Sequence, residues 1–179
     1  MDLTLLAVAI APGLAIVVFI YCKDKFDKEP RKLLIISFLL GMLSVVPAIV
    51  FEEIGSTVLP PSDSMLVTFL NTFFVIGLSE EFSKFFMLRI YPYRKKEFNE
   101  PFDGIMYAVM VSMGFATLEN IFYVNQYGMG NAVFRMFTAV PAHASFAVIM
   151  GYFVGLAKFK NNSLFLQLQG LVFAAILHG

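Results

Sequence analysis

Four stretches of the sequence run for about twenty residues without a charged side chain. They are residues 3–22, 33–51, 136–157 and 161–179. Each is close to the ~20 residues that a helix needs to cross the hydrocarbon core of a bilayer. Of the 179 residues, 59% are apolar and 15% are charged, against about 45–50% and 25% in an average soluble domain. The sequence therefore predicts a polytopic membrane protein.

The charge balance and the cysteine content exclude several other classes of protein. Thirteen basic residues balance thirteen acidic ones, so no basic surface for nucleic acid is indicated. The single cysteine, Cys22, has no partner for an internal disulfide. The first apolar run has no basic residue before it and is longer than the ~7–15-residue core of a signal peptide. We therefore expect this run to be the first transmembrane span.

Two further spans contain charged residues and are recognised by their flanking sequences. One lies between the turn-forming residues 59–64 and the basic residues 93–96, and the other between residues 100–101 and residues 128–130. The expected fold is an all-α transmembrane bundle of six spans, at about residues 3–22, 33–54, 65–89, 102–127, 132–157 and 163–179. Connections this short leave no room for a soluble domain. Residues 1–179 are therefore expected to form a single membrane-embedded domain.

The basic residues predict the orientation of the spans. Eleven of the thirteen lie in or beside the first, third and fifth connections, while Lys84 lies inside a span and Arg135 on the opposite side. By the positive-inside rule, these three connections are cytoplasmic and the N terminus is outside. His178 and Gly179 stand where an apolar helix would still be crossing. We therefore expect the last span to be truncated and the C-terminal part of the domain to be missing.

The third predicted span contains an unusual polar group, Glu80-Glu81-Phe82-Ser83-Lys84. On a helix, Lys84 follows the two glutamates at spacings of i,i+4 and i,i+3, so the three side chains share a face. Ionisable side chains inside a membrane are costly and by default indicate a functional site. Two adjacent carboxylates beside one ammonium can share a proton, which is an arrangement suited to a general base. The alternative is an ion pair that orders the bundle or snorkels to the cytoplasm.

Further polar side chains lie in the last three spans. Glu119 and Asn120 are in the fourth span, His143 in the fifth and His178 in the sixth. At about 1.5 Å of rise per residue, the three ionisable side chains and Glu80 lie between the middle of the bilayer and its outer leaflet. We expect them to meet in a water-filled cavity open to the outer side. Taken singly, Glu119 fits a metal site, a water-orienting group or a buried hydrogen bond, and each histidine fits a packing role.

Seven short motifs follow one another along nearly the whole chain. They are Ala11-Pro12-Gly13, residues 23–30 (KDKFDKEP), Glu80-Glu81-x-x-Lys84, Asp103-Gly104, residues 114–120 (GFATLEN), His143-Ala144 and His178-Gly179. In this order and on separate spans, the motifs resemble those of the PrsW family of bacterial intramembrane proteases. The family's last motif continues past His-Gly to an aspartate, which these 179 residues do not include.

The resemblance implies a multi-pass protease of the bacterial cell membrane that makes the site-1 cut in an anti-sigma factor on its extracytoplasmic side. The expected partners are a single-span anti-sigma factor and the lipid bilayer, without nucleic acid. PrsW proteins are distantly similar to CAAX prenyl endopeptidases, which arrange glutamates, histidines and an asparagine around a water without an obligatory metal. By this resemblance Glu80 and Glu81 match the first motif and Glu119 matches the second, where the CAAX enzymes have a histidine.

The expected mechanism is hydrolysis by a water that one of Glu80 and Glu81 activates, with no metal cofactor. Lys84 would position the base, the histidines would hold the water or stabilise the oxyanion, and Glu119 would orient them together with Asn120. The expected catalytic residues are Glu80, Glu81, Lys84, Glu119, His143 and His178, with Phe115 and Asn120 as orienting or substrate-supporting residues.

Two other functions remain open at this point. The carboxylates and histidines are adequate zinc ligands, which would make the chain a zinc-dependent membrane protease, although the sequence contains no HExxH helix. A proton- or cation-coupled transporter would also bury glutamates, a lysine and histidines. We find neither the internal repeat nor the paired broken helices of such transporters.

Overall fold

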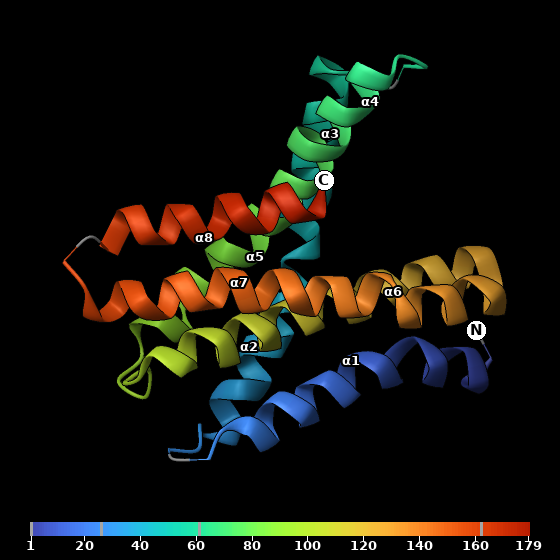
Figure 1. Ribbon diagram of the computed structural model, residues 1–179. Coiled ribbons are helices and arrows are strands. Elements are labelled where there is room, and N and C mark those ends of the chain that lie inside the picture. Colours follow the sequence, from blue (N-terminus) through green and yellow to red (C-terminus); the bar gives the residue numbers. More distant parts are fainter. Residues whose placement is uncertain (1, 26, 61, 162) are drawn as a thin grey trace.

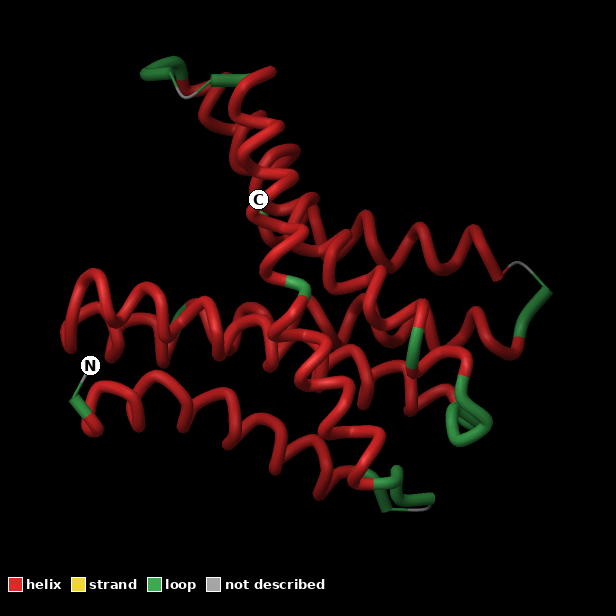
Figure 2. The backbone as a smooth tube through the Cα atoms, turned by 180° about the vertical axis from the view of Figure 1, so that it is seen from behind, coloured by secondary structure: helices red, strands yellow, loops and turns green. Residues whose placement is uncertain are grey.

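The computed structural model describes residues 2–25, 27–60, 62–161 and 163–179 (Figures 1 and 2). Phe26 of the first-connection motif and Pro61 of the predicted turn lie outside these residues. The elements in chain order are α1 (Leu3–Lys23), α2 (Arg31–Leu43), α3 (Val45–Val58), α4 (Met65–Leu70), the π-helix η1 (Asn71–Gly77), α5 (Leu78–Ile90), the 3₁₀ helix η2 (Pro92–Arg94), α6 (Pro101–Phe137), α7 (Ala139–Phe159) and α8 (Ser163–His178). The described residues contain no strand, and the all-α prediction is confirmed.

Four helical stretches are long and apolar enough to cross a membrane. They are Leu3–Lys23, Arg31–Val58, Met65–Arg94 and Pro101–Phe159, and the shorter apolar helix α8 follows them. The second stretch combines α2 and α3, and the third combines α4, η1, α5 and η2. Such a set of helices is that of a polytopic membrane protein, as the sequence predicted.

The long helix α6 reverses direction at Gly128 (Figures 1 and 2). Gly128 has φ 76° and ψ −166°, a backbone conformation outside the helical region that favours glycine. Val124 and Ala132, on either side of this residue, are packed in the same buried cluster. The reversal provides the two antiparallel spans that the sequence predicted around residues 128–130. The second of these helices begins directly after the turn instead of at residue 132.

The first half of α6 is the centre of the bundle. All residues from 106 to 117 are buried, and α1, α2 and α7 pack around this helix. Glycines allow the helix backbones to approach closely, as is typical of membrane bundles. A Cβ on Gly104 would collide with the backbone of Gly151 and Gly155 of α7, and one on Gly114 would collide with the backbone of α2. The residues of α6 that face the site are therefore held by a rigid centre.

The third span contains a π-helix that the sequence did not predict. Asn71 begins this segment, and its side-chain amide donates a hydrogen bond of 2.9 Å to the carbonyl of Leu59. The segment ends at Gly77, three residues before the first glutamate of the polar motif. Figures 1 and 2 show α3 and the α4–η1 helix side by side, extending away from the other helices. π-Helical turns are frequent at functional sites.

Acidic residues of the first connection are buried, whereas its basic residues are exposed. Asp24 and Glu29 have exposed fractions of only 3% and 5%, and the Asp24 carboxylate accepts a hydrogen bond from the Glu29 backbone N–H at 3.2 Å. Tyr107 of α6 donates its hydroxyl hydrogen to Glu29. The Asp103 carboxylate caps α6 by accepting the N–H groups of residues 99 and 100. These contacts attach the first connection to the beginning of α6.

The buried position of Glu29 predicts a pH-dependent stability. Burial, together with the nearby carboxylates of Asp103 and Asp24, raises the pKa of Glu29 from 4.5 to about 8. The folded state therefore binds more protons than the unfolded state between about pH 4.5 and 8, so the free energy of unfolding falls as the pH rises through this window. Glu29→Gln should reduce this slope, measured by thermal unfolding of the detergent-solubilised chain from pH 5 to 9.

The matched control is Glu97→Gln, which changes an exposed carboxyl in a neighbouring connection. This variant should keep the slope of the wild type. Equal slopes for Glu29→Gln and the wild type would contradict the assignment of the pH dependence to Glu29.

Candidate active site

The two glutamates and the lysine of α5 form a buried ionic group. Glu80, Glu81 and Lys84 have exposed fractions of 5%, 1% and 2%. The Lys84 Nζ atom lies 3.0 Å from Oε2 of Glu80 and 2.8 Å from Oε1 of Glu81. The helical spacings expected from the sequence place both carboxylates on the same ammonium. One positive charge thus faces two acidic side chains inside the bundle.

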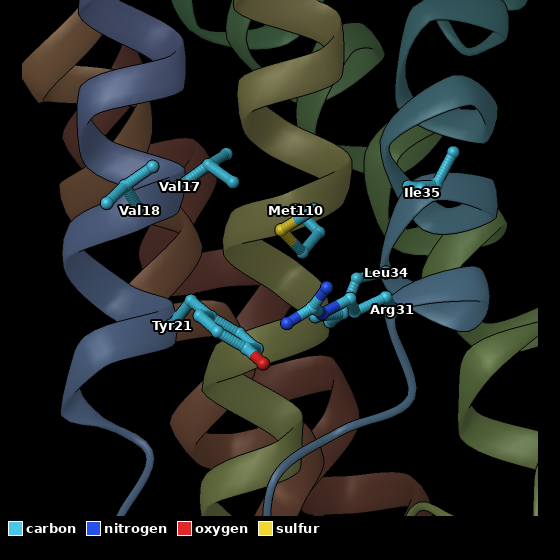
Figure 3. Close-up of a pocket in the computed structure, with 7 residues that line it drawn as sticks. All are labelled: Val17, Val18, Tyr21, Arg31, Leu34, Ile35 and Met110. Carbon is cyan, nitrogen blue, oxygen red and sulfur yellow. The ribbon is translucent and has the colours of Figure 1, made fainter.

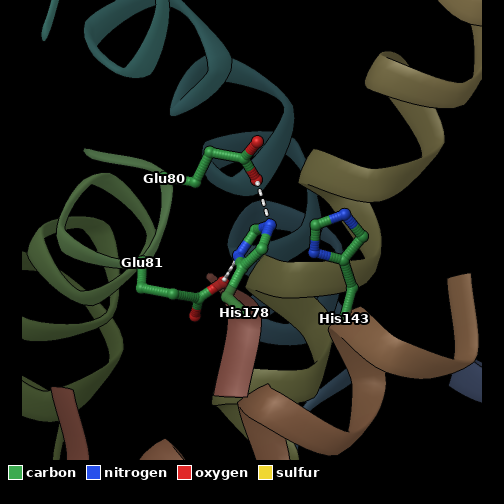
Figure 4. Close-up of side chains that lie close together, drawn as sticks. All are labelled: Glu80, Glu81, His143 and His178. Atoms are coloured by element: carbon green, nitrogen blue, oxygen red, sulfur yellow. Dashed lines mark hydrogen bonds and ion pairs between the residues drawn. The ribbon is translucent and has the colours of Figure 1, made fainter. Parts of the chain in front are cut away.

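His178, the last residue of α8, closes this group from the opposite side (Figure 4). Its Nδ1 atom lies 3.0 Å from Oε1 of Glu81, and its Nε2 atom lies 3.7 Å from Oε2 of Glu80. A carboxylate only accepts hydrogen bonds, so Nδ1 of His178 carries the hydrogen that points to Glu81. The imidazole edge therefore faces both carboxylates.

His143 of α7 connects Lys84 with the carboxylate of the fourth predicted span. Its Nδ1 atom lies 3.1 Å from the Lys84 Nζ atom, and its Nε2 atom lies 3.1 Å from Oε2 of Glu119. An ammonium group only donates, so Nδ1 must accept and Nε2 must carry the hydrogen donated to Glu119. The geometry thus selects one tautomer of a neutral imidazole. The side chain is held at both nitrogens, so its role in this arrangement is to fix its neighbours.

Glu119 is also bound by Arg135, a residue that the sequence analysis did not include in the site. The Arg135 guanidinium lies 2.6 Å from Oε2 of Glu119 and donates a bond of 2.9 Å to the side-chain oxygen of Asn120. Asn120 in turn donates to the Ala9 carbonyl of α1 at 2.9 Å. Arg135 and Asn120 face one another because the chain reverses at Gly128 between them. The only signal in the sequence was an isolated basic residue on the predicted outer side.

Aromatic rings surround the charged group. The Lys84 Nζ atom lies 4.0 Å from the centroid of the Phe115 ring, within the range of a cation–π contact. The ring of Phe146 lies 5.1 Å from that of His178, and the two histidine rings are also 5.1 Å apart. Phe115 thus supports Lys84, in keeping with the supporting role expected for it. Phe146 was not predicted, because nothing distinguishes it from the other phenylalanines of the chain.

Four of the polar residues offer donor atoms that suit a metal ion. One atom from each of Glu80, Glu81, His143 and His178 lies within 4.8 Å of the others. Carboxylate oxygens and imidazole nitrogens are ligands that zinc takes in proteins. Lys84 contacts three of these four residues with a positive charge. The donor types fit a zinc ion, and the lysine is the group that such an ion would have to displace.

A groove lies beside the glutamates on the outside of the bundle. It has a volume of about 280 Å³ and is lined by Phe51 of α3, Phe74 of η1, and Leu78, Ser79 and Phe82 of α5. The rings of Phe51 and Phe82 are in edge contact, with centroids 5.9 Å apart. Ser79 immediately precedes Glu80, so this apolar groove ends next to the buried carboxylates.

The order and placement of these residues agree with a comparison against protein families. The family described as "PrsW family intramembrane metalloprotease" matches residues 29–179. The chain belongs to the PrsW family. This confirms the resemblance inferred from the seven motifs, and it makes the chain a member of a family of membrane-embedded proteases. The finding does not support the transporter alternative.

Curated PrsW proteases from several bacteria are similar to nearly the whole chain. The chain is 38% identical to Protease PrsW of Bacillus subtilis over 178 residues, which are 98% of this chain and 79% of the relative. It is 42% identical to Protease PrsW of Oceanobacillus iheyensis, with 89% and 72% of the two chains covered. For the protein of the same name from Geobacillus kaustophilus the identity is 38%, with 87% and 68% covered. No solved structure matches the chain.

The contacts of Arg135 predict that this residue stabilises the fold of the PrsW chain. Arg135→Met would leave Glu119 without its guanidinium partner in a nearly buried position. Removing one member of a buried ion pair costs about 3–5 kcal/mol, and partial exposure reduces this to about 2 kcal/mol. Thermal unfolding in detergent should therefore show a lower melting temperature for Arg135→Met, with partial recovery in Arg135→Lys.

Tyr123→Phe is the control for this experiment. The Arg135 guanidinium lies 4.1 Å from the centroid of the Tyr123 ring, and phenylalanine keeps that ring. This variant should melt close to the wild type. An unchanged melting temperature in Arg135→Met would show that the ion pair with Glu119 does not stabilise the protein.

Proposed function

We propose that this chain hydrolyses a peptide bond of a membrane-spanning protein with a water molecule that Glu80 activates. The observation that carries this proposal is the buried pair of carboxylates that shares the single ammonium of Lys84. One ammonium compensates about one carboxylate charge, so the other carboxylate favours taking up a proton. Glu81 is held by both Lys84 and His178 through the same oxygen. Glu80 is the freer of the two and adjoins the groove at Ser79, which makes it the proposed base.

In the proposed reaction, the carboxylate of Glu80 takes a proton from water as the water oxygen bonds to the scissile carbonyl carbon. The negative charge that develops on the carbonyl oxygen is stabilised by the hydrogen-bond donors around Glu80, with the Lys84 ammonium as the strongest of them. Glu80 then returns the proton to the amide nitrogen that leaves as the amine. His143, Glu119 and Arg135 hold Lys84 in place through the chain of contacts described above.

The proposed substrate is a single-span anti-sigma factor in a bacterial cell membrane, cut on the extracytoplasmic side. The bacterial origin of the curated relatives supports this location. The apolar groove between α3 and α5 supports entry of a membrane-embedded segment beside Glu80. The expected topology places this part of the bundle toward the outer leaflet. The π-helix next to the groove gives the entry region a backbone that differs from the regular helices around it.

The first test replaces the proposed base. Glu80→Gln should lower cleavage of a single-span reporter by about 10²–10⁴-fold, the usual contribution of a general base. The reporter is cleaved in liposomes containing the purified protein and followed by gel electrophoresis. Glu53→Gln, which changes an exposed glutamate of α3, serves as the control and should retain activity. Full activity in Glu80→Gln, with the variant still folded in the membrane, would refute the assignment of the base.

A zinc-dependent protease is a second candidate, favoured by the family description and by the four donor residues within 4.8 Å. Glu80, Glu81, His143 and His178 would hold the ion, and the donor set fits it in type and proximity. When bound, zinc would lower the pKa of a coordinated water and polarise the scissile carbonyl. Lys84 would then have to leave the position in which it contacts three of these residues.

Chelation separates the two candidates. If Glu80 acts without a metal, incubation with 1,10-phenanthroline leaves reporter cleavage unchanged, because no ion is withdrawn from the site. The metal content of the purified protein, measured by elemental mass spectrometry, should then show no stoichiometric zinc. Loss of cleavage that zinc restores, together with about one zinc per chain that His178→Ala removes, would instead establish the metal-dependent reaction.

A further inference from the structure

A second groove lies on the opposite part of the bundle, between α1 and α2 and above α6 (Figure 3). Its volume is about 280 Å³. Most of its wall is apolar and is formed by Val17 and Val18 of α1, Leu34 and Ile35 of α2, and Met110 of α6. None of these residues belongs to the candidate active site. The groove therefore requires an explanation of its own.

One end of the groove is polar and positively charged. Arg31, the first residue of α2, and Tyr21, near the end of α1, line this end. Figure 3 shows the Arg31 guanidinium extending from α2 toward the Tyr21 ring. The Lys28 Nζ atom lies 4.5 Å from the centroid of that ring. Among the described residues, no carboxylate forms a salt bridge with Arg31 or Lys28.

The polarity of the groove changes along its length in the same way as that of a phospholipid. The basic end adjoins the first connection, which the positive-inside rule places at the cytoplasmic membrane surface. One helical turn further along α1 and α2, the lining consists of Val17, Val18, Leu34 and Ile35, which lie deeper in the bilayer. A helix with side chains is about 10–12 Å in diameter, so a space of this volume would contain less than one helical turn. The space fits a hydrocarbon chain better than a partner helix.

We propose that this groove is a specific site for a phospholipid with an anionic headgroup. The phosphate group is bound by Arg31, whose planar guanidinium suits two phosphate oxygens, and Lys28 adds a second positive charge. An acyl chain lies along the valines of α1 and the apolar residues of α2, over Met110. The bound lipid contacts α1, α2 and α6 at once, next to the acidic contacts that attach the first connection to α6.

A zwitterionic lipid satisfies only part of this site. Its phosphate also fits Arg31, but its positively charged amine meets the same uncompensated basic side chains. A basic residue near an anionic bilayer surface contributes about 1 kcal/mol to binding, which corresponds to about fivefold in affinity. The site therefore predicts a preference for anionic over zwitterionic lipids that depends on Arg31.

Native mass spectrometry of the full chain tests this proposal. The protein is purified in a neutral detergent and supplied with equal amounts of phosphatidylglycerol and phosphatidylcholine that carry the same acyl chains. We expect one phosphatidylglycerol to be retained preferentially on the wild type, and Arg31→Gln to reduce that preference by about fivefold. Ile35→Trp, which places a large side chain into the groove from a largely exposed position, should lower the retention of both lipids.

Lys160→Gln is the matched control, because Lys160 is an exposed basic residue on the same predicted side and does not line this groove. This variant should keep the wild-type preference. Melting temperatures without added lipid establish that each variant is folded, and phosphatidylglycerol should raise that of the wild type more than that of Arg31→Gln. Equal retention of the two lipids by the wild type, or an equal loss of preference in Arg31→Gln and Lys160→Gln, would overturn the proposal. Neither outcome depends on proteolytic activity.

Discussion

The buried ammonium of Lys84 is the interaction on which the arrangement of the site depends. An unpaired charge inside a membrane protein is costly, and its removal from water is compensated only by close partners. Lys84 has two carboxylates, one imidazole nitrogen and one aromatic ring around it, contributed by α5, α6 and α7. Each of these helices must keep its position if the charge is to remain compensated. The bundle thus obtains its register at this depth from one side chain.

The charged groups continue beyond Lys84 as a connected chain of contacts. His143 joins Lys84 to Glu119, and Glu119 joins Arg135, which in turn binds Asn120. Positive or hydrogen-donating groups alternate with acceptors along this chain, so each buried polar group has a partner of the right kind. Such a network transmits a displacement at the Gly128 hairpin to the carboxylates of α5. The outer hairpin is therefore part of the support of the site, although it contributes no group to the proposed chemistry.

The sequence predicted the all-α fold, the family and the positions of the spans because these follow from local patterns. Uncharged runs define the helices, and the spacing of Glu80, Glu81 and Lys84 places them on one helical face. The order of the motifs on separate spans led to His143, His178 and Glu119, which the structure brings to the same group. Arg135 and the buried acids Asp24 and Glu29 could not be recognised in this way. Their partners lie on other helices, and an isolated charge in a connection is normally solvated.

The π-helix before α5 was also beyond prediction, because its winding depends on tertiary contacts and not on a sequence pattern. It is wound more loosely than an α-helix, so each of its residues turns the following side chains through a smaller angle. Everything after Gly77 is consequently rotated about the helix axis relative to regular α-helical winding. Lys84 and its carboxylates would otherwise point toward a different neighbour. The segment from Asn71 to Gly77 therefore sets the phase of the helix, and the number of residues in it matters more to the site than their identity.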